Sequence, residues 1–158
     1  MGTLQLNTAP VAEAAMLIRR PAIDAFNAFV DPAITTKFWF TKGSGKLEEG
    51  KQVQWDWEMY NFSAQVKAET VEPGRRIVAH WGNDAGGYTR IEWVFTPHGD
   101  DATFVEVTNS GFTGTGDEQV KKALDSNGGF TWVLAGLKAW LEHGVQLNLV
   151  ADRFPQGK

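Results

Sequence analysis

"KQVQWDWEMYNFSAQVKAE" (residues 51–69) is the least ordinary part of the sequence. Large apolar residues take every second position from Val53 to Met59, and polar residues fill the positions between them. A period of two is that of a β-strand with one apolar and one polar face. Trp55 and Trp57 would then point to the same side, where a second layer must cover them. They either fill a core or line a space that another molecule occupies.

The alternation continues on both sides of this stretch. Turn sequences such as EEGK, GNDAGG and PHGDD separate the apolar runs, and the strands are expected at 45–48, 51–60, 62–72, 75–81, 88–97 and 102–110. Because the connections are short, neighbouring strands must pair antiparallel, since a parallel return needs a crossover of about a dozen residues or more. Residues 11–19 predict one further strand near the N-terminus.

Helical patterns flank these strands. Pro21 suits the first position of a short helix, and Asp31-Pro32 starts a second helix that closes at Trp39-Phe40. Residues 117–149 return to helical spacing, with an apolar stripe of Phe130, Val133, Leu134, Leu137 and Leu141 that Val120 and Leu124 extend backwards. Gly128-Gly129 interrupt the stripe at about 1 kcal/mol each, so a continuous helix and two helices both remain open.

The order of elements indicates the fold class. One strand, two short helices, six strands and a long C-terminal helix predict an α+β fold, in which a curved antiparallel sheet of about seven strands wraps around the last helix. The apolar face of the sheet and the stripe of the helix would form one core. We expect a single domain over residues 1–158, with residues 1–9 as a loose tail and a core over about 11–149.

Composition excludes several classes of function. Hydrophobic residues make up 42% and the net charge is −4 with a pI of about 5.3, so neither nucleic acid nor an anionic membrane is an expected partner. The absence of cysteine excludes disulfides and thiolate catalysis. No apolar run approaches the ~18 residues of a membrane span, and the N-terminus lacks the pattern of a signal peptide. The default expectation is a cytoplasmic, soluble protein.

Motifs for catalysis, metals and cofactors are weak. The three histidines, His80, His98 and His143, have no metal-ligand spacing, so no metal is expected. Asp56 and Glu58 could act as an acid–base pair, but they share the polar face of their strand and are better explained as solvated residues. The two glycine-rich stretches lack P-loop spacing, so no nucleotide and no cofactor is expected.

Three quoted segments carry a resemblance to a known family: FVDPAITTKFWF at 29–40, VTNSGF at 107–112 and GGFTWVLAGLKAWLEHG at 128–144. Together with the element order they resemble the START-like, helix-grip superfamily (SRPBCC), which includes birch-pollen-allergen-like proteins and polyketide cyclases. Within it, the chain most resembles the group named for the C-terminal domain of the activator of the heat-shock-protein-90 ATPase. The resemblance covers roughly residues 11–144. It implies a cavity between sheet and helix for small hydrophobic molecules, and no shared catalytic residues.

The aromatic side chains are the expected cavity wall. Alternation in the strands and the stripe of the last helix give a candidate set of Trp39, Trp55, Trp57, Met59, Trp81, Trp93, Phe95, Phe112, Asn127, Phe130, Thr131 and Leu134. Phe104 belongs to the same aromatic set, Asn109 is an inward polar candidate, and Tyr88 and Arg90 are expected at the cavity mouth. The alternative is that the aromatic residues simply fill the core. Buried aromatics remove about 150–250 Å² each from water, which is reason enough to retain them.

Three functions remain open at this stage. The leading hypothesis is non-catalytic binding of a small hydrophobic or aromatic ligand between the sheet and the last helix. The second is a polyketide cyclase- or dehydratase-like enzyme, which needs an acid or base inside the cavity, and no catalytic residue is assigned. The third is a chaperone-interaction domain that stimulates an ATPase, which the family resemblance implies. The partner is then a small hydrophobic molecule or a chaperone, and the chain is a monomer or a homodimer.

Overall fold

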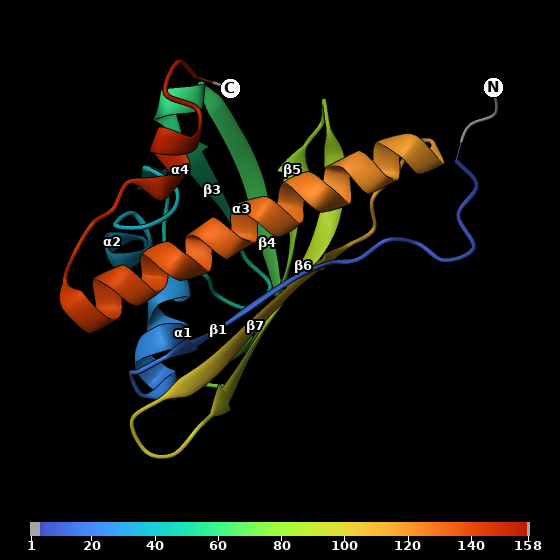
Figure 1. The fold of residues 1–158 in the computed structure, drawn as a ribbon. Coiled ribbons are helices and arrows are strands. Elements are labelled where there is room, and N and C mark those ends of the chain that lie inside the picture. Colours follow the sequence, from blue (N-terminus) through green and yellow to red (C-terminus); the bar gives the residue numbers. More distant parts are fainter. Residues whose placement is uncertain (1–3, 158) are drawn as a thin grey trace.

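A curved sheet wraps around one long helix in the computed structural model, which describes residues 4–157 (Figure 1). All neighbouring strands pair antiparallel, in the order β1-β7-β6-β5-β4-β3-β2. The strands are β1 (Ala12–Ile18), β2 (Lys42–Gly43), β3 (Gln52–Trp57), β4 (Phe62–Glu72), β5 (Arg76–Asn83), β6 (Gly87–Pro97) and β7 (Thr103–Ser110). The predicted helix-grip architecture is therefore confirmed.

The helices are α1 (Ala22–Val30), α2 (Pro32–Thr35), the 3-10 turn η1 (Glu58–Tyr60), α3 (Gly116–His143) and α4 (Leu149–Arg153). Helix α3 runs unbroken through Gly128 and Gly129, which settles the question that the sequence left open. Thr115 and Glu118 form a capping box at its start, and Gly144 ends it with φ 65°. Within the described residues, no helix has both the length and the apolar character that crossing a membrane requires.

Several predicted boundaries are wrong, each for a local reason. Residues 45–48 do not form a strand, because Leu47 donates its N–H to the carbonyl of Val30 and lies against α1. Strand β3 stops at Trp57, since the chain turns through η1 and reverses at Asn61 with φ 50°. Met59 therefore lies in this turn and not in the strand with Trp55 and Trp57. Helix α2 ends at Thr35, so Trp39-Phe40 belong to an irregular loop, and α3 ends before residues 144–148.

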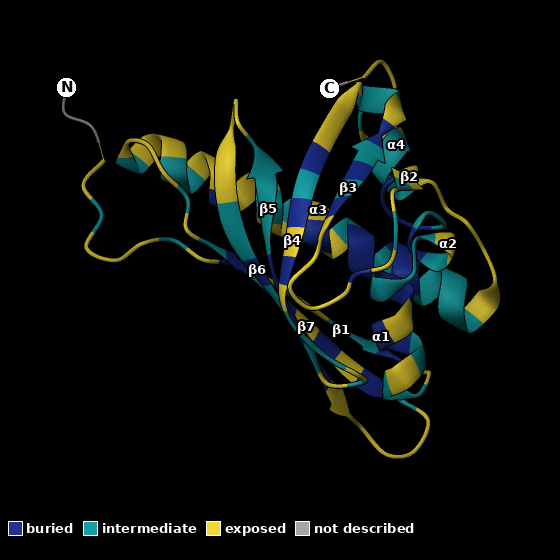
Figure 2. Cartoon of the chain, turned by 180° about the vertical axis from the view of Figure 1, so that it is seen from behind, coloured by how far each residue is buried: buried dark blue, intermediate teal, exposed yellow. Residues whose placement is uncertain are grey.

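The core lies between the concave face of the sheet and the C-terminal half of α3. Phe130, Leu134 and Leu137 of α3 are buried there, whereas Leu124 is 68% exposed. The N-terminal part of α3 extends past the sheet, as Figures 1 and 2 show from opposite sides. The predicted extension of the apolar stripe to Leu124 is therefore wrong, because in this turn it is Ala123 that is buried.

Helix α3 also protects the free edge of β1. The side chain of Asn127 accepts from the N–H of Glu13 at 3.2 Å, and Glu142 Oε2 accepts from the N–H of Arg19 at 2.9 Å. Lys138 Nζ donates to the carbonyl of Leu17 at 2.7 Å and to Glu142 at 2.8 Å. Unpaired strand edges invite pairing with other chains, so these side chains satisfy groups that would otherwise remain open.

We expect Glu142→Gln to destabilise the fold by about 1–3 kcal/mol at pH 7, because two charge-assisted hydrogen bonds are weakened. Burial alone would raise the pKa of Glu142, but the hydrogen bonds from Lys138 and from Arg19 hold the pKa below its ordinary value of 4.5. The ionised form therefore stabilises the fold above about pH 4.5, and this contribution is lost as the pH falls through the lower folded-state pKa.

Urea unfolding at pH 7 and at pH 3.5 measures this contribution. The difference between wild type and Glu142→Gln should be largest at pH 7 and should shrink in acid. Glu106→Gln, on an exposed residue of β7, is the control and should change stability by less than about 0.5 kcal/mol. A pH-independent difference for Glu142→Gln would contradict the expectation.

Candidate functional site

Trp39 is the central residue of the site. It lies in the irregular loop between α2 and β2, and only 7% of its surface is exposed. The loop sits directly on α3, because Gly136 has no side chain: a Cβ built there would come within 3.0 Å of Phe38 Cβ and 3.3 Å of the Phe38 carbonyl oxygen. Gly136 thus sets how deeply the neighbouring Trp39 reaches between the helix and the sheet.

Other aromatic rings surround Trp39 on several sides. The distances between ring centroids are 5.0 Å to Trp55, 5.5 Å to Phe130 and 5.6 Å to Trp81. We call the surrounding rings the aromatic cage, which consists of Phe29, Phe40, Trp55, Trp57, Trp81, Trp93 and Phe130. They come from α1, the loop after α2, β3, β5, β6 and α3. A single loop-borne indole therefore fills the middle of a space that five secondary-structure elements and their connecting loop enclose.

The cage is apolar but contains one unsatisfied donor. Within residues 4–157 the buried polar or charged residues are Thr35, Thr103 and Asn109. Asn109 donates to Thr89 Oγ1 and to the Arg90 carbonyl, and it accepts from Ser126 at 2.8 Å. The hydrogen-bonding groups of the Asn109 side chain are thus satisfied within the protein. In contrast, the Nε1 atom of Trp93 is buried with no hydrogen-bond partner in the described structure. An unpaired buried N–H costs free energy that an acceptor on a ligand would recover.

A cavity of about 80 Å³ lies beside Trp39, on the side away from most of the cage. Residues from the loop after α2, from η1 and from the C-terminus enclose it: Thr36, Lys37, Phe38, Trp39, Thr41, Met59, Gln146, Asn148, Leu149, Val150 and Ala151. We call residues 144–157, which fold back from the end of α3, the C-terminal segment. Figure 1 shows this segment returning to the end of the sheet where β3 and β4 turn.

Contacts with η1 and α3 hold the C-terminal segment in place. The Tyr60 hydroxyl donates to the Val150 carbonyl, and burial raises the pKa of Tyr60 above 10.0, which keeps the hydroxyl a donor. The guanidinium of Arg153 lies 5.6 Å from the ring centroid of Trp132 on α3 and 4.4 Å from that of Phe154. Gly144 and Asn148 have left-handed backbone conformations, with φ 65° and 58°. The segment thus closes the outer side of the cavity.

A second hollow, of about 250 Å³, lies apart from the cage. It is formed by the start of β1 and the N-terminal part of α3, and its lining is Pro10, Val11, Ala12, Val120, Ala123, Leu124 and Asn127. None of these residues belongs to the aromatic cage. Its one side-chain polar group, the amide of Asn127, already accepts a hydrogen bond from Glu13. This hollow therefore brings together no groups that point to a ligand.

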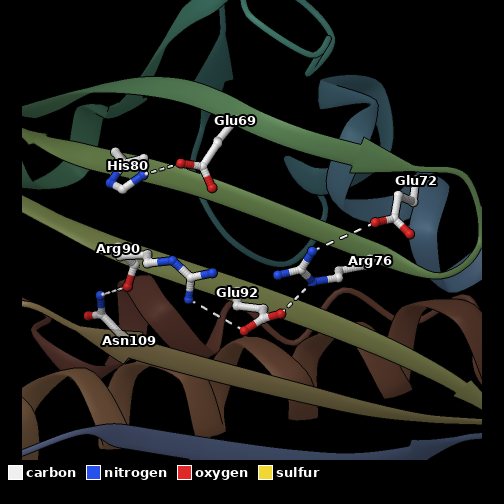
Figure 3. A network of polar contacts seen from close by, with 7 residues as sticks. All are labelled: Glu69, Glu72, Arg76, His80, Arg90, Glu92 and Asn109. Atoms are coloured by element: carbon white, nitrogen blue, oxygen red, sulfur yellow. Dashed lines mark hydrogen bonds and ion pairs between the residues drawn. The ribbon is translucent and has the colours of Figure 1, made fainter.

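Charged side chains occupy the face of the sheet away from α3 (Figure 3). Arg76 pairs with Glu92 at 2.5 Å and with Glu72 at 3.7 Å, and Arg90 pairs with Glu92 at 3.4 Å. The hydrogen bond from Arg76 is the main cause that holds the pKa of Glu92 below its ordinary value. His80 lies 3.4 Å from Glu69 on the same face. These partly exposed pairs form a solvated ladder with little effect on stability.

The structure places the predicted site residues in three groups. It brings together Trp39, Trp55, Trp57, Trp81, Trp93 and Phe130, and it buries Phe95 and Leu134 in the adjoining core. Met59 lines the small cavity. The others lie apart from the cage: Phe112 follows β7, Asn127 and Thr131 are exposed on α3, Phe104 is 39% exposed, and Tyr88 and Arg90 point to the outer face by strand alternation.

Sequence reasoning missed the two cage residues Phe29 and Phe40. Phe40 belongs to the segment FWF, in which every residue is buried, and its ring stacks on Trp55 at 4.6 Å. An uninterrupted aromatic run in a loop was the available signal. Phe29 lies on the buried face of α1, and the helical pattern there predicts only a core residue. Asp56 and Glu58 do not form an acid–base pair, because Glu58 lies in η1 and not in the strand. Hydrogen bonds from Ser63 and Gln54 lower the pKa of Asp56.

Comparison with known families and structures agrees with this architecture. Residues 19–142 match the family described as Activator of Hsp90 ATPase homolog 1-like protein. The C-terminal segment lies outside that range. No protein with a curated description matches the sequence.

Among solved structures, protein SSP2350 from Staphylococcus saprophyticus is 30% identical, with a TM-score of 0.74 over 87% of this chain and 96% of that chain. The Aha1 dimer from Colwellia psychrerythraea is 18% identical, with a TM-score of 0.73 over 85% and 98%. PFC0360w, an HSP90 activator from Plasmodium falciparum, is 15% identical, with a TM-score of 0.67 over 84% and 97%. The last two show the fold alone. From the family match, the chain belongs to the activator of Hsp90 ATPase homolog 1-like proteins of the START-like superfamily.

Proposed function

We propose that this protein binds a small hydrophobic or aromatic molecule between the sheet and α3, in the space that the Trp39 side chain fills. The observation that carries the proposal is the position of Trp39. A loop supplies this ring to the centre of the cage, and an 80 Å³ cavity lies next to it. A loop can move more readily than the sheet or helix that carries the cage.

The dimensions of the cage favour a flat aromatic ligand. Its rings lie 5.0–6.3 Å from the Trp39 ring, centroid to centroid, which is the ordinary range of edge-to-face and offset aromatic contacts. Engineered apolar cavities of ~150 Å³ stay dry and bind benzene. The space that the Trp39 indole fills is also lined by apolar rings, so it could bind an aromatic ligand when the Trp39 side chain moves out. The ligand would take over the contacts of Trp39.

Binding has more support than catalysis. The described residues include no buried Asp, Glu, His, Lys or Arg, and the cage residues themselves carry no titratable group. The cyclase alternative needs a general acid or base within ~3 Å of the substrate. Tyr60, whose pKa is raised by burial, packs against the core, but its hydroxyl is already bonded to Val150. The proposal is therefore a non-catalytic binding protein, and the cysteine-free sequence is compatible with its placement in the cytoplasm.

Native mass spectrometry of the freshly purified protein, followed by a thermal-shift screen with indole and substituted naphthalenes, tests the proposal. We expect a bound mass that is lost on denaturation, or a rise in Tm with an aromatic compound. A ligand at about 100 times its Kd adds ~2.7 kcal/mol, which is roughly 5–10 °C in a chain of this size. A clean mass and no shift with any compound would sink the proposal.

Two variants locate the ligand that such a screen identifies. Trp81→Ala removes a half-buried wall of the cage and should weaken binding about tenfold, since one aromatic contact is worth ~0.5–1.5 kcal/mol beyond its buried area. Phe104→Ala removes an aromatic residue of similar kind from the outer face and should leave the Kd unchanged. Equal weakening by both variants would place the ligand elsewhere.

Chaperone interaction is the second candidate function, and the family match is the observation that favours it. In this proposal the protein, as a monomer or as a homodimer, stimulates an Hsp90-type ATPase. The Colwellia relative is described as a dimer and the Plasmodium relative as an HSP90 activator. Stimulation of ATP hydrolysis by this chain, with Trp81→Ala as active as wild type, would favour this function over ligand binding.

A further inference from the structure

The small cavity between Trp39 and the C-terminal segment combines an apolar inner side with polar groups at its rim. Trp39, Met59 and Val150 contribute the apolar surface. Lys37, Gln146 and Asn148, whose side chains carry a cation and two amides, are also among its lining residues. The cavity is about 80 Å³, which is enough room for a small polar group such as a carboxylate.

The polar groups at the rim are available to a ligand. The Lys37 ammonium lies 5.6 Å from the ring centroid of Trp140 and makes no ion pair with any residue between 4 and 157. The side-chain amides of Gln146 and Asn148 make no hydrogen bond within the same range. In contrast, Thr36 Oγ1 donates to Pro32 and Thr41 Oγ1 donates to Asp56, so both hydroxyls are engaged. A cation next to two amide donors matches the acceptor oxygens of a carboxylate.

Resting on the proposed function, we infer that this cavity is a second subsite of the ligand site, which binds the carboxylate of an aromatic acid. The ring of the ligand takes the place of the Trp39 indole, and its carboxylate extends into the cavity to meet Lys37. Trp39 fills the cage and also lines the cavity, so the two spaces become continuous when its side chain moves. Ligand specificity at this end depends on Lys37 and on the C-terminal segment.

Most of the rim of this subsite lies outside the part of the chain that matches the family. The C-terminal segment supplies Gln146, Asn148 and Val150, and it lies beyond the residues that match the family. The carboxylate-binding rim is therefore built largely from residues beyond the range that the family model matches. A relative that keeps the cage and lacks an equivalent segment would bind uncharged aromatic compounds without a preference for acids.

Indole-3-acetate and 3-methylindole form a matched pair of probes, because they differ only in the carboxylate. Isothermal titration calorimetry should show that wild type binds indole-3-acetate about tenfold more tightly than 3-methylindole, as expected for one charge-assisted hydrogen bond. In Lys37→Met the preference should fall to about twofold or less, with the Kd for 3-methylindole unchanged. Lys37→Arg keeps the cation and should retain most of the preference.

Lys67→Met is the control, because Lys67 is an exposed lysine on the outer face of β4. It should retain the full tenfold preference. Equal Kd values for the two probes in wild type, or an unchanged preference in Lys37→Met, would overturn the inference and leave the binding function standing. If neither probe binds to wild type or to Trp39→Ala, the proposed function itself fails and the subsite fails with it.

Discussion

Replacement of Trp39 by alanine should have opposite effects on stability and on ligand affinity. We expect Trp39→Ala to lower the free energy of unfolding by about 3–5 kcal/mol, as large-to-small substitutions of buried tryptophan do. At roughly 2–4 °C per kcal/mol the Tm should fall by about 10 °C. The same variant should bind indole at least tenfold more tightly than wild type, because the side chain no longer competes for the cage. An ordinary core position would show only the loss of stability.

Phe26→Ala is the matched control for this prediction. Phe26 is 4% exposed and contacts Phe95, and it is not a member of the aromatic cage. Its removal should cost a similar 3–5 kcal/mol, but the cavity it leaves is of phenyl size and cannot accept an indole. Calorimetric titration with indole and thermal unfolding in its presence compare the two variants. If indole binds Trp39→Ala no better than wild type, the indole of Trp39 is core and not a substitute for a ligand.

The second large effect is expected at the hairpin between β5 and β6. Gly82 has φ 150°, and a Cβ built there would lie 1.9 Å from the carbonyl oxygen of Gly87 and 3.0 Å from Tyr88 Cα. Both neighbours are backbone atoms that the antiparallel register holds in place, since Gly82 pairs with Tyr88. We expect Gly82→Ala to cost about 3 kcal/mol or more, because the backbone strain and the clash each cost ~1–3 kcal/mol.

Gly87→Ala separates strain from clash in the same hairpin. Gly87 has φ 82°, but an added Cβ there has no heavy atom within 4 Å. Its substitution should therefore cost only the strain, about 1–2 kcal/mol. Urea unfolding of both variants measures the difference. Gly82→Ala should also weaken ligand binding, because the adjacent Trp81 is a wall of the cage. Equal losses for the two variants would mean that the hairpin relaxes around the added methyl group.

Several features of the site could be predicted from local patterns. The alternation of Trp55 with Trp57 placed both rings on the inner face, and the parity of Trp81 and Trp93 did the same for β5 and β6. The same rule applied to Arg90 would have assigned it to the outer face, where the structure places it beside Glu92. Arg90 was instead expected at the cavity mouth because it lies close to the glycine-rich loop GNDAGG.

Other features depend on contacts between residues far apart in the chain. Trp39 has no periodic neighbours, and its central place follows from the close approach of Phe38 to Gly136 on α3. The C-terminal segment reaches the site through the hydrogen bond between Tyr60 and Val150, which are 90 residues apart. Gly128 and Gly129 remain helical, although each weakens a helix by about 1 kcal/mol, because α3 gains the packing of Phe130 and Leu134 on the sheet.

Apart from the strand expected at 45–48, local sequence patterns account for the strands, for the antiparallel pairing of successive strands and for the inward face that carries the tryptophans. These follow from the period of two, from short turns and from the helical stripe, all of which are properties of residues within about ten positions of one another. In contrast, the position of Trp39 in the cage and that of the C-terminal segment beside the cavity depend on long-range contacts. Those placements depend on which surfaces meet after the sheet curves around α3, and the free energy of that packing belongs to pairs of residues that no local pattern connects.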